Sequence, residues 1–189
     1  MSILVGGGQA YYGPTASRDK NVVQIAAQLL RESELDIQVV TGGTAGVPDD
    51  FAMRYASGGR VVDIVSSEFL ETYKERTKDR PRAYWVAGET QEKRRLAFLK
   101  NPDIKVGLFI QGGQYTAHEI HLFEESGRTA IVFLGSGGAS GGKIAYKGWS
   151  YRPHKRIARA YDSEDPDENP YDIARDLIED VVSAWKRAQ

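Results

Sequence analysis

Short apolar runs alternate along this chain with stretches of helical periodicity, and glycine-rich turns follow most of the runs. The runs are rich in valine and isoleucine and occupy residues 3–5, 37–40, 61–65, 104–110 and 130–134. Apolar residues at helical spacing occupy residues 21–31, 47–56, 90–100 and 172–187. Strands this apolar are buried on both faces, which requires a mostly parallel sheet covered by helices on both sides. The sequence therefore predicts one Rossmann-like α/β domain over residues 1–189, with five or more strands.

The composition of the chain argues against some classes of binding partner. The chain has 189 residues, of which 41% are hydrophobic, and this is enough for a full core. The formal net charge of −1 provides no basic field that would attract nucleic acid. The chain has no cysteine, and neither a signal peptide nor a membrane-spanning run is apparent. We expect a cytoplasmic protein whose partner is neither nucleic acid nor a membrane and which needs no cofactor.

The glycine turns indicate where a ligand would bind. Ligands of parallel α/β sheets bind beyond the carboxyl ends of the strands, and glycine allows the backbone to approach them closely. Turns of this kind follow the first, second, fourth and fifth predicted strands. The first two supply the candidate ligand-binding residues Gly7, Gly8, Gly42, Gly43 and Thr44.

The segment 112–119, Gly-Gly-Gln-Tyr-Thr-Ala-His-Glu, carries the most information about chemistry. A buried strand that ends in Gly112 and Gly113 and then starts a helix leaves backbone N–H groups unpaired, and such groups bind anions, most often phosphate. Thr116 would add a hydroxyl, and Glu119 follows one helical turn later on the same face. The competing interpretation is structural, because Thr-x-x-Glu is also a capping box at a helix start.

Several other motifs are excluded. The turn at 6–11 has Tyr11 where a dinucleotide-binding loop needs its third glycine. Neither a P-loop nor a Gly-x-Ser-x-Gly elbow occurs. His118 and His121 are three residues apart, whereas zinc-binding helices place two histidines four apart, so no metal site is expected.

The order of these parts resembles the LOG family, once misnamed lysine decarboxylases, within the SLOG superfamily of nucleotide-binding proteins. Residues 112–119 are similar to that family's Pro-Gly-Gly-x-Gly-Thr-x-x-Glu motif, and residues 40–47 to its second glycine turn. Glu92-Lys93-Arg94-Arg95 occupies the place of the family's Met-x-x-Arg-Lys helix. The resemblance covers roughly residues 1–135.

The resemblance implies a phosphoribohydrolase, which cuts the N-glycosidic bond of a nucleoside 5′-monophosphate. By this likeness Gly112, Gly113 and Thr116 would hold the phosphate, Glu119 would be the catalytic carboxylate, and Arg94 or Arg95 its partner. For the two arginines a solvated helix face is the alternative. The resemblance also implies a homodimer or higher oligomer, to which the apolar face of residues 118–124 would contribute.

The chain departs from the family in three places. Gln111 replaces the proline, and Tyr115 replaces a glycine, where it would crowd a phosphate or stack on a base. The loop 135–142 is closer to SLOG domains that bind ADP-ribose-like ligands without consuming them. A non-catalytic nucleotide sensor and a deoxyribosyltransferase-like enzyme with Glu119 as nucleophile therefore stay open. The basic stretch 143–159 either borders the anion or lies in a solvated loop, and the aromatic residues at 84–85 and 148–151 receive no role.

Overall fold

The computed structural model describes residues 1–57, 59–144 and 164–189, so most of the basic stretch 143–159 and all of 148–151 lie outside the described residues. At the edges of this gap Lys143 pairs with Glu164 at 2.8 Å. Glu164 belongs to the acidic stretch 162–168, so this contact joins the start of the basic stretch to an acidic one.

The fold is built on one six-stranded sheet in which every described strand pair is parallel. Its strands are β1 (Ser2–Gly7), β2 (Gln38–Thr41), β3 (Arg60–Val65), β4 (Ala83–Val86), β5 (Ile104–Ile110) and β6 (Thr129–Phe133). Their order across the sheet is β4-β3-β2-β1-β5-β6. The chain winds outward from β1 to β4 and then returns to pair β5 with the other side of β1. The order reverses between β1 and β5, which is where ligands bind in sheets of this kind.

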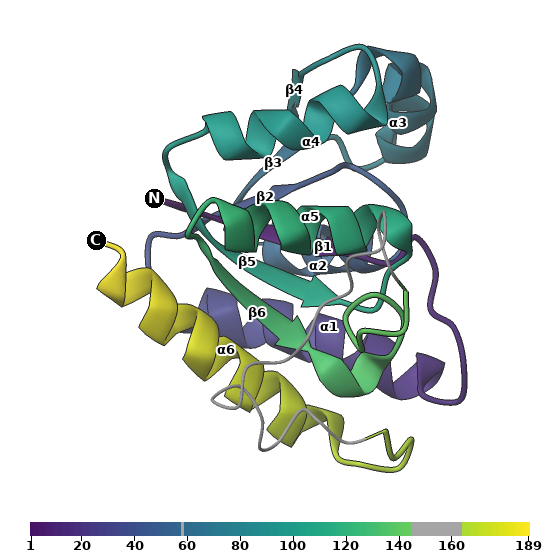
Figure 1. Ribbon diagram of the computed structural model, residues 1–189, viewed down its shortest axis with the longest axis vertical. Coiled ribbons are helices and arrows are strands. Elements are labelled where there is room, and N and C mark those ends of the chain that lie inside the picture. The colour runs from purple at the N-terminus through teal and green to yellow at the C-terminus, as the bar shows by residue number, and fades with distance from the viewer. Residues whose placement is uncertain (58, 145–163) are drawn as a thin grey trace.

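Helices cover both faces of the sheet (Figure 1). One face packs against α1 (Ala16–Glu32), α2 (Val47–Tyr55) and α6 (Pro170–Arg187). The other packs against α4 (Gln91–Lys100) and α5 (Gln114–Glu125). Helix α3 (Leu70–Thr77) contacts the edge strand β4 through an edge-on pair of Tyr73 and Tyr84. Two short turns, η1 (Ser67–Phe69) and η2 (Leu134–Ser136), complete the described chain.

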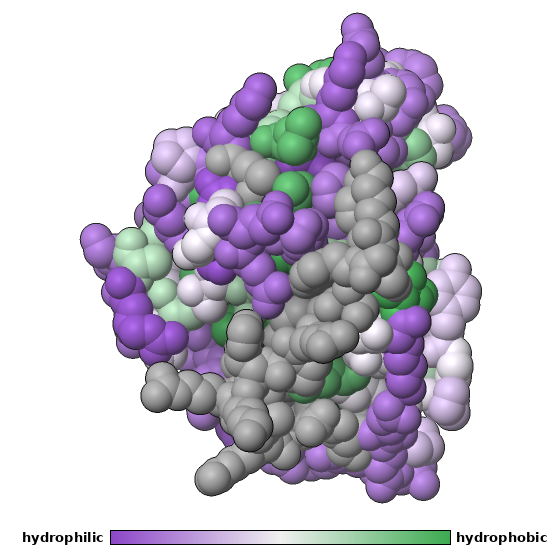
Figure 2. All heavy atoms as spheres, in the orientation of Figure 1, coloured by the Kyte–Doolittle hydropathy of each residue, from purple (hydrophilic) through white to green (hydrophobic). Residues whose placement is uncertain are grey.

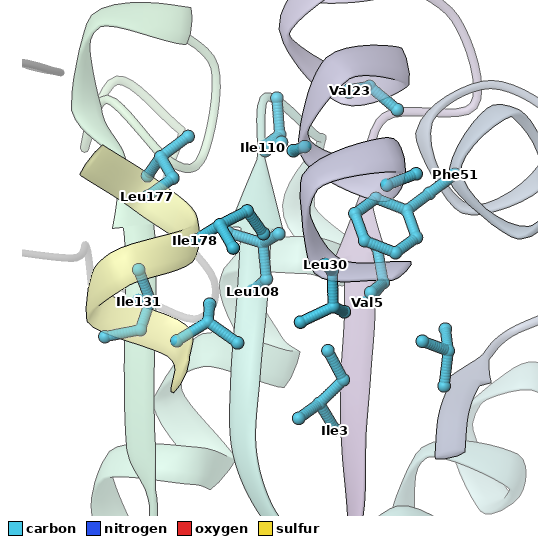
Figure 3. Packing of buried hydrophobic residues seen from close by; sticks show 14 of the residues in the cluster. Ile3, Val5, Val23, Leu30, Phe51, Leu108, Ile110, Ile131, Leu177 and Ile178 are labelled. Carbon is cyan, nitrogen blue, oxygen red and sulfur yellow. The ribbon is translucent and has the colours of Figure 1, made fainter. Parts of the chain in front are cut away.

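The larger core lies between α6, α1, α2 and the sheet (Figure 3). Leu177 and Ile178 of α6 lie over Leu108 of β5 and Ile131 of β6, and each is at most 5% exposed. A buried aliphatic side chain of this size contributes about 1.5–3 kcal/mol. Asn169 caps the start of helix α6, because its side chain accepts the amide N–H of Tyr171, and Pro170 occupies the first turn.

The smaller core corrects one expectation. The apolar side chains of α5, Ile120 and Phe123, are at most 1% exposed, and the Phe123 ring packs edge-on against Phe109 at 5.4 Å. They belong to the core of the chain itself, so this face of residues 118–124 is not available to a partner subunit. On the face drawn in Figure 2, hydrophilic side chains surround small hydrophobic areas.

Two elements were not predicted. Strand β4 has four exposed residues and lies at the sheet edge, where the pattern of a buried strand is lost. Helix α3 is short and strongly polar, with Tyr73 and Thr77 as its buried residues. Among the described helices, none combines the length and apolar character needed to cross a membrane.

Candidate functional site

A cavity of about 270 Å³ opens at the carboxyl ends of β1, β2 and β5. It lies at the point where the strand order reverses, as the position of the glycine turns predicts. Its lining comes from strand β1, from the turns after β1, β2 and β5, and from helices α2, α4 and α5: Leu4, Val5, Gly6, Gly7, Gly8, Gln9, Tyr12, Gly42, Thr44, Pro48, Gln91, Arg94, Arg95, Phe98, Gly113, Gln114, Tyr115, Thr116 and Glu119.

The start of α5 forms one wall. Gly113 is the residue before the helix, it makes no side-chain cap, and a Cβ added there would meet open space. The first amide groups of a helix have no acceptor within the helix, and residues 113–116 all line the cavity. This wall can therefore bind an anion, and a helix N-terminus also favours negative charge.

Thr116 does not cap this helix, which corrects the capping-box interpretation. The helix begins at Gln114, so Thr116 already lies inside its first turn. Its hydroxyl instead donates to the backbone carbonyl of Gly7 at 3.3 Å, joining α5 to the end of β1. Gly112 adopts φ +101°, and a Cβ added there would overlap the side chain of Thr116. Glycine is therefore needed at 112 for this contact to form.

Glu119 lies deeper in the cavity, between two arginines of α4. Its Oε1 is 3.6 Å from Nη2 of Arg94 and 3.6 Å from Nε of Arg95. All three side chains are buried, with Glu119 9% exposed and each arginine 3% exposed. A Cβ added at Gly6 would lie 3.0 Å from the other carboxylate oxygen of Glu119, so the glycine at the end of β1 also makes room for this acid.

The electrostatics of this cluster favour an anionic ligand. With Glu119 ionised, two guanidinium groups face one carboxylate and leave one net positive charge. The Nε atoms of Arg94 and Arg95 are buried and have no hydrogen-bond partner within the described residues. Buried donors without a partner are costly, and an anion that enters the cavity can reduce that cost. The solvated-face alternative for Arg94 and Arg95 does not fit their burial.

Burial sets the direction of the pKa shifts. It raises the pKa of Glu119, while the positive charges of Arg94 and Arg95 oppose that rise. Burial also lowers the pKa of the Arg94 guanidinium, against the attraction of Glu119. The carboxylate is therefore poorly solvated and depends on its two arginine neighbours for its charge. Such a group is typical of functional sites.

The turn after β2 positions Arg94. A Cβ at Gly42 would overlap Nη1 of Arg94 and lie 2.9 Å from its Cζ, so Arg94 passes directly over this glycine. Nη1 of Arg94 also donates to the carbonyl of Ile64 at 3.3 Å. The hydroxyl of Thr41 accepts the amide N–H of Gly43 at 2.9 Å and donates to Asp63 at 2.5 Å, which fixes the turn from behind.

Asp63 anchors this support, and the sequence analysis did not identify it. Its side chain is fully buried and also accepts hydrogen bonds from Tyr73 at 2.9 Å and Arg82 at 2.8 Å. The signal was present, because an aspartate in the middle of the apolar run 61–65 needs buried partners.

Not every predicted residue reaches the cavity. Gly7, Gly8, Gly42, Thr44, Gly113, Tyr115, Thr116, Glu119, Arg94 and Arg95 line it. Gly43 and Gly112 do not, and they act instead through the shape of their turns. The 135–142 loop also lies away from the lining. It supports the turn after β5, since Ala139 donates to the carbonyl of Gly112 at 2.9 Å and Ser140 to that of Gln111 at 3.2 Å.

Tyr115 does not fill the space at the start of α5. Tyr115 is 53% exposed, and the guanidinium carbon of Arg95 lies 4.0 Å from the centre of its ring. This is close cation–π geometry. Tyr12 is a further rim residue, 69% exposed, which the sequence analysis did not select. Within the described residues no cluster of three histidine or acidic side chains could hold a metal ion.

Thirteen chains of known structure are similar to this one. One is the X-ray structure of TM1055, a structural genomics target. It is 21% identical, with a TM-score of 0.59, and the match covers 95% of this chain and 99% of that chain. At this identity the likeness supports the Rossmann-like α/β fold and says nothing about the reaction. No protein-family model matches the chain. No curated protein matches it either.

Proposed function

We propose that this protein hydrolyses the N-glycosidic bond of a nucleoside 5′-monophosphate, as a LOG-like member of the SLOG superfamily. One observation carries the proposal: Glu119 is a buried carboxylate between two buried arginines, in a cavity that also exposes the start of α5. The proposal includes a cytoplasmic location and a homo-oligomeric state, both expected from the sequence.

The phosphate would bind at the start of α5. The amide groups there and the net positive charge of the arginine cluster both favour a group with two negative charges. Because Glu119 lies one helical turn beyond Thr116, a ribose attached to that phosphate would extend toward the carboxylate. The phosphate would therefore bind in one part of the cavity, at the start of α5, and the bond would be cut in another part, beside Glu119.

The reaction needs a carboxylate near the anomeric carbon. The bond between C1′ and the base nitrogen breaks, and the base leaves with the electron pair. The oxygen of a water molecule forms a new bond to C1′, and its proton balances the charge on the departing base. The sugar becomes cation-like in the transition state, and Glu119 would stabilise that charge while it orients the water or a ribose hydroxyl.

The arginines would keep Glu119 ionised. Burial alone would favour the protonated acid, which could not stabilise a cation. Two guanidinium groups at 3.6 Å counteract this effect. Arg95 is also stacked on Tyr115, so its position is restrained from the opposite side.

A second candidate function is nucleotide binding without turnover. Tyr115 stands where the resembled family has glycine, and with Arg95 it forms a wall beside the proposed phosphate site. A bulky residue at that point could hold a nucleotide in a pose that keeps C1′ away from Glu119.

The test is release of free base. The protein is incubated with the monophosphates of adenosine, guanosine, cytidine and uridine, and products are separated by chromatography. We expect base and ribose 5-phosphate from at least one substrate, with loss of activity in Glu119→Gln. Glu125→Gln is the matched control, because Glu125 is an exposed glutamate at the far end of the same helix. Nucleotide-dependent thermal stabilisation without base release would favour the sensor. Base exchange without net hydrolysis would favour a transferase.

A further inference from the structure

Two tyrosine rings lie at the cavity and stay largely in solvent. Tyr12 is 69% exposed and Tyr115 is 53% exposed, and both line the cavity. A tyrosine ring can bury a large apolar area when it binds another flat group, and bases stack readily on aromatic side chains. Two such rings at one cavity are therefore candidates for contact with the flat part of a ligand.

The backbone of Tyr12 is fixed although its ring is free. Its N–H donates to Oε1 of Gln111 at 3.1 Å, and its carbonyl accepts from Nε2 of Gln111 at 3.2 Å. The same Nε2 donates its second hydrogen to Oδ2 of Asp19 at 2.7 Å. The Gln111 amide is thus bound at both ends and cannot be reversed, since reversal would set its oxygen against the Asp19 carboxylate.

Buried contacts fix the Gln111 side chain that holds the backbone of Tyr12. Gln111 is 2% exposed, and Asp19 is fully buried and accepts hydrogen bonds from Thr15 and Arg18. The polar atoms of Gln111 serve to place one residue of the loop between β1 and α1. Because Tyr12 is 69% exposed and lines the cavity, its placement has no evident use in the core.

Tyr115 is restrained differently. The guanidinium carbon of Arg95 lies over its ring at 4.0 Å from the centre, and about half of the residue stays accessible. A base stacked on the accessible surface would extend a cation–ring–base stack. Cation–π and stacking contacts of this kind are sequence-tolerant, because every base has a flat π-face.

We propose that Tyr12 and Tyr115 bind the planar heteroaromatic base of the nucleotide by stacking, and that Gln111 is the positioning residue for Tyr12. This inference rests on the nucleotide ligand of the proposed function, but not on its hydrolysis. The cavity volume agrees with it. At about 270 Å³ the cavity lies just below the range of roughly 300–1,000 Å³ that encloses a whole drug-sized ligand. The phosphate and sugar then occupy the interior, and the base lies at the rim.

The experiment separates binding from turnover. Calorimetry on the whole protein compares formycin 5′-monophosphate, whose base is joined by a carbon–carbon bond that this chemistry does not cut, with ribose 5-phosphate, which has no base. We expect the nucleotide to bind more tightly than ribose 5-phosphate. Tyr12→Ala should weaken nucleotide binding by about 5- to 150-fold, the range for loss of one base–aromatic stack. Its affinity for ribose 5-phosphate should not change.

Conservative and control variants test whether a loss of nucleotide affinity comes from the loss of the tyrosine ring at the cavity. Tyr12→Phe and Tyr115→Phe keep the ring and should keep nucleotide affinity. Tyr171→Ala removes an exposed tyrosine of α6 that does not line the cavity, and it should have no effect. Gln111 adopts φ +55°, and Gln111→Asn shortens the side chain while asparagine still tolerates a positive φ. It should lower nucleotide affinity as Tyr12→Ala does, and the double variant should lose no more than either single variant.

The inference is overturned if Tyr12→Ala and Tyr115→Ala leave nucleotide affinity unchanged, or if Tyr12→Ala weakens ribose 5-phosphate by the same factor. Base release from natural nucleotides with tyrosine-independent affinity would support the proposed function and overturn this inference. Tyrosine-dependent binding without base release would support this inference and contradict hydrolysis of the nucleotide.

Discussion

Gly42→Ala tests whether the turn after β2 positions the arginine that faces Glu119. Gly42 is outside the left-handed φ region, so alanine does not strain the backbone itself. The added Cβ would overlap Nη1 of Arg94 and lie 2.9 Å from Cζ and 3.0 Å from Nη2, whereas ordinary contact begins at 3.4 Å. Nη2 is the atom that lies 3.6 Å from the Glu119 carboxylate. The substitution therefore shifts the Arg94 guanidinium relative to the Glu119 carboxylate.

The size of the effect follows from this displacement. Cζ must withdraw by about half an ångström and Nη1 by more, so the guanidinium moves by on the order of 1 Å, a misplacement that can lower a rate about 100-fold. Overpacking of a buried site costs about 1–3 kcal/mol of stability. We expect Gly42→Ala to stay folded and to lose about 100-fold in kcat/KM for base release.

The assay combines kcat/KM with urea unfolding in a double-mutant cycle. In an Arg94→Ala background the clashing guanidinium is gone, so the stability cost of Gly42→Ala should fall close to zero. An equal cost in both backgrounds would refute the reasoning, because the alanine would then disturb something other than Arg94. Unchanged base release in Gly42→Ala would refute it as well.

Three further predictions concern the support of the site, its charge and its turn. Asp63→Asn removes the buried carboxylate that pairs with Arg82, so the free energy of unfolding measured in urea should fall by about 3–5 kcal/mol; a change within experimental error would contradict this. Burial raises the pKa of Glu119 above its ordinary 4.5, so base release should decline as pH falls through that raised pKa. Arg95→Met removes a charge that lowers this pKa, so the acidic limb of the pH–rate profile should move to higher pH, and movement to lower pH would argue against the account. Gln111→Pro, which restores the residue of the resembled family, should lower the melting temperature by several degrees, because Gln111 adopts φ +55° and proline is restricted to about −65°; an unchanged melting temperature would count against this.

The fold could be predicted largely because most residues of its buried strands are apolar. The run at 104–110 coincides with β5, and the glycine turns mark the correct edge of the sheet. Prediction failed at β4 and α3. The exposed edge strand has no buried pattern, and α3 is fixed by tertiary contacts such as that of Tyr73 with Asp63, which no local periodicity reveals.

The site was predictable where backbone geometry determines it. Paired glycines before a helix predict exposed amides, and the spacing of Thr116 and Glu119 predicts a shared face. The contacts between distant segments could not be predicted. The path of Arg94 over Gly42 and the connection of Gln111 to Tyr12 join residues far apart in the sequence, and only the packed sheet brings them together.

The central claim is that the carboxylate of Glu119 promotes cleavage of a glycosidic bond in a bound nucleotide. The most direct measurement is single-turnover release of free base from each nucleoside 5′-monophosphate, with the wild-type protein, Glu119→Gln and Glu125→Gln in parallel. The account predicts release by the wild-type protein and Glu125→Gln, and loss of at least about 100-fold in Glu119→Gln if the carboxylate stabilises the transition state. Equal release by all three proteins, or release by none of them despite saturating nucleotide, would contradict it.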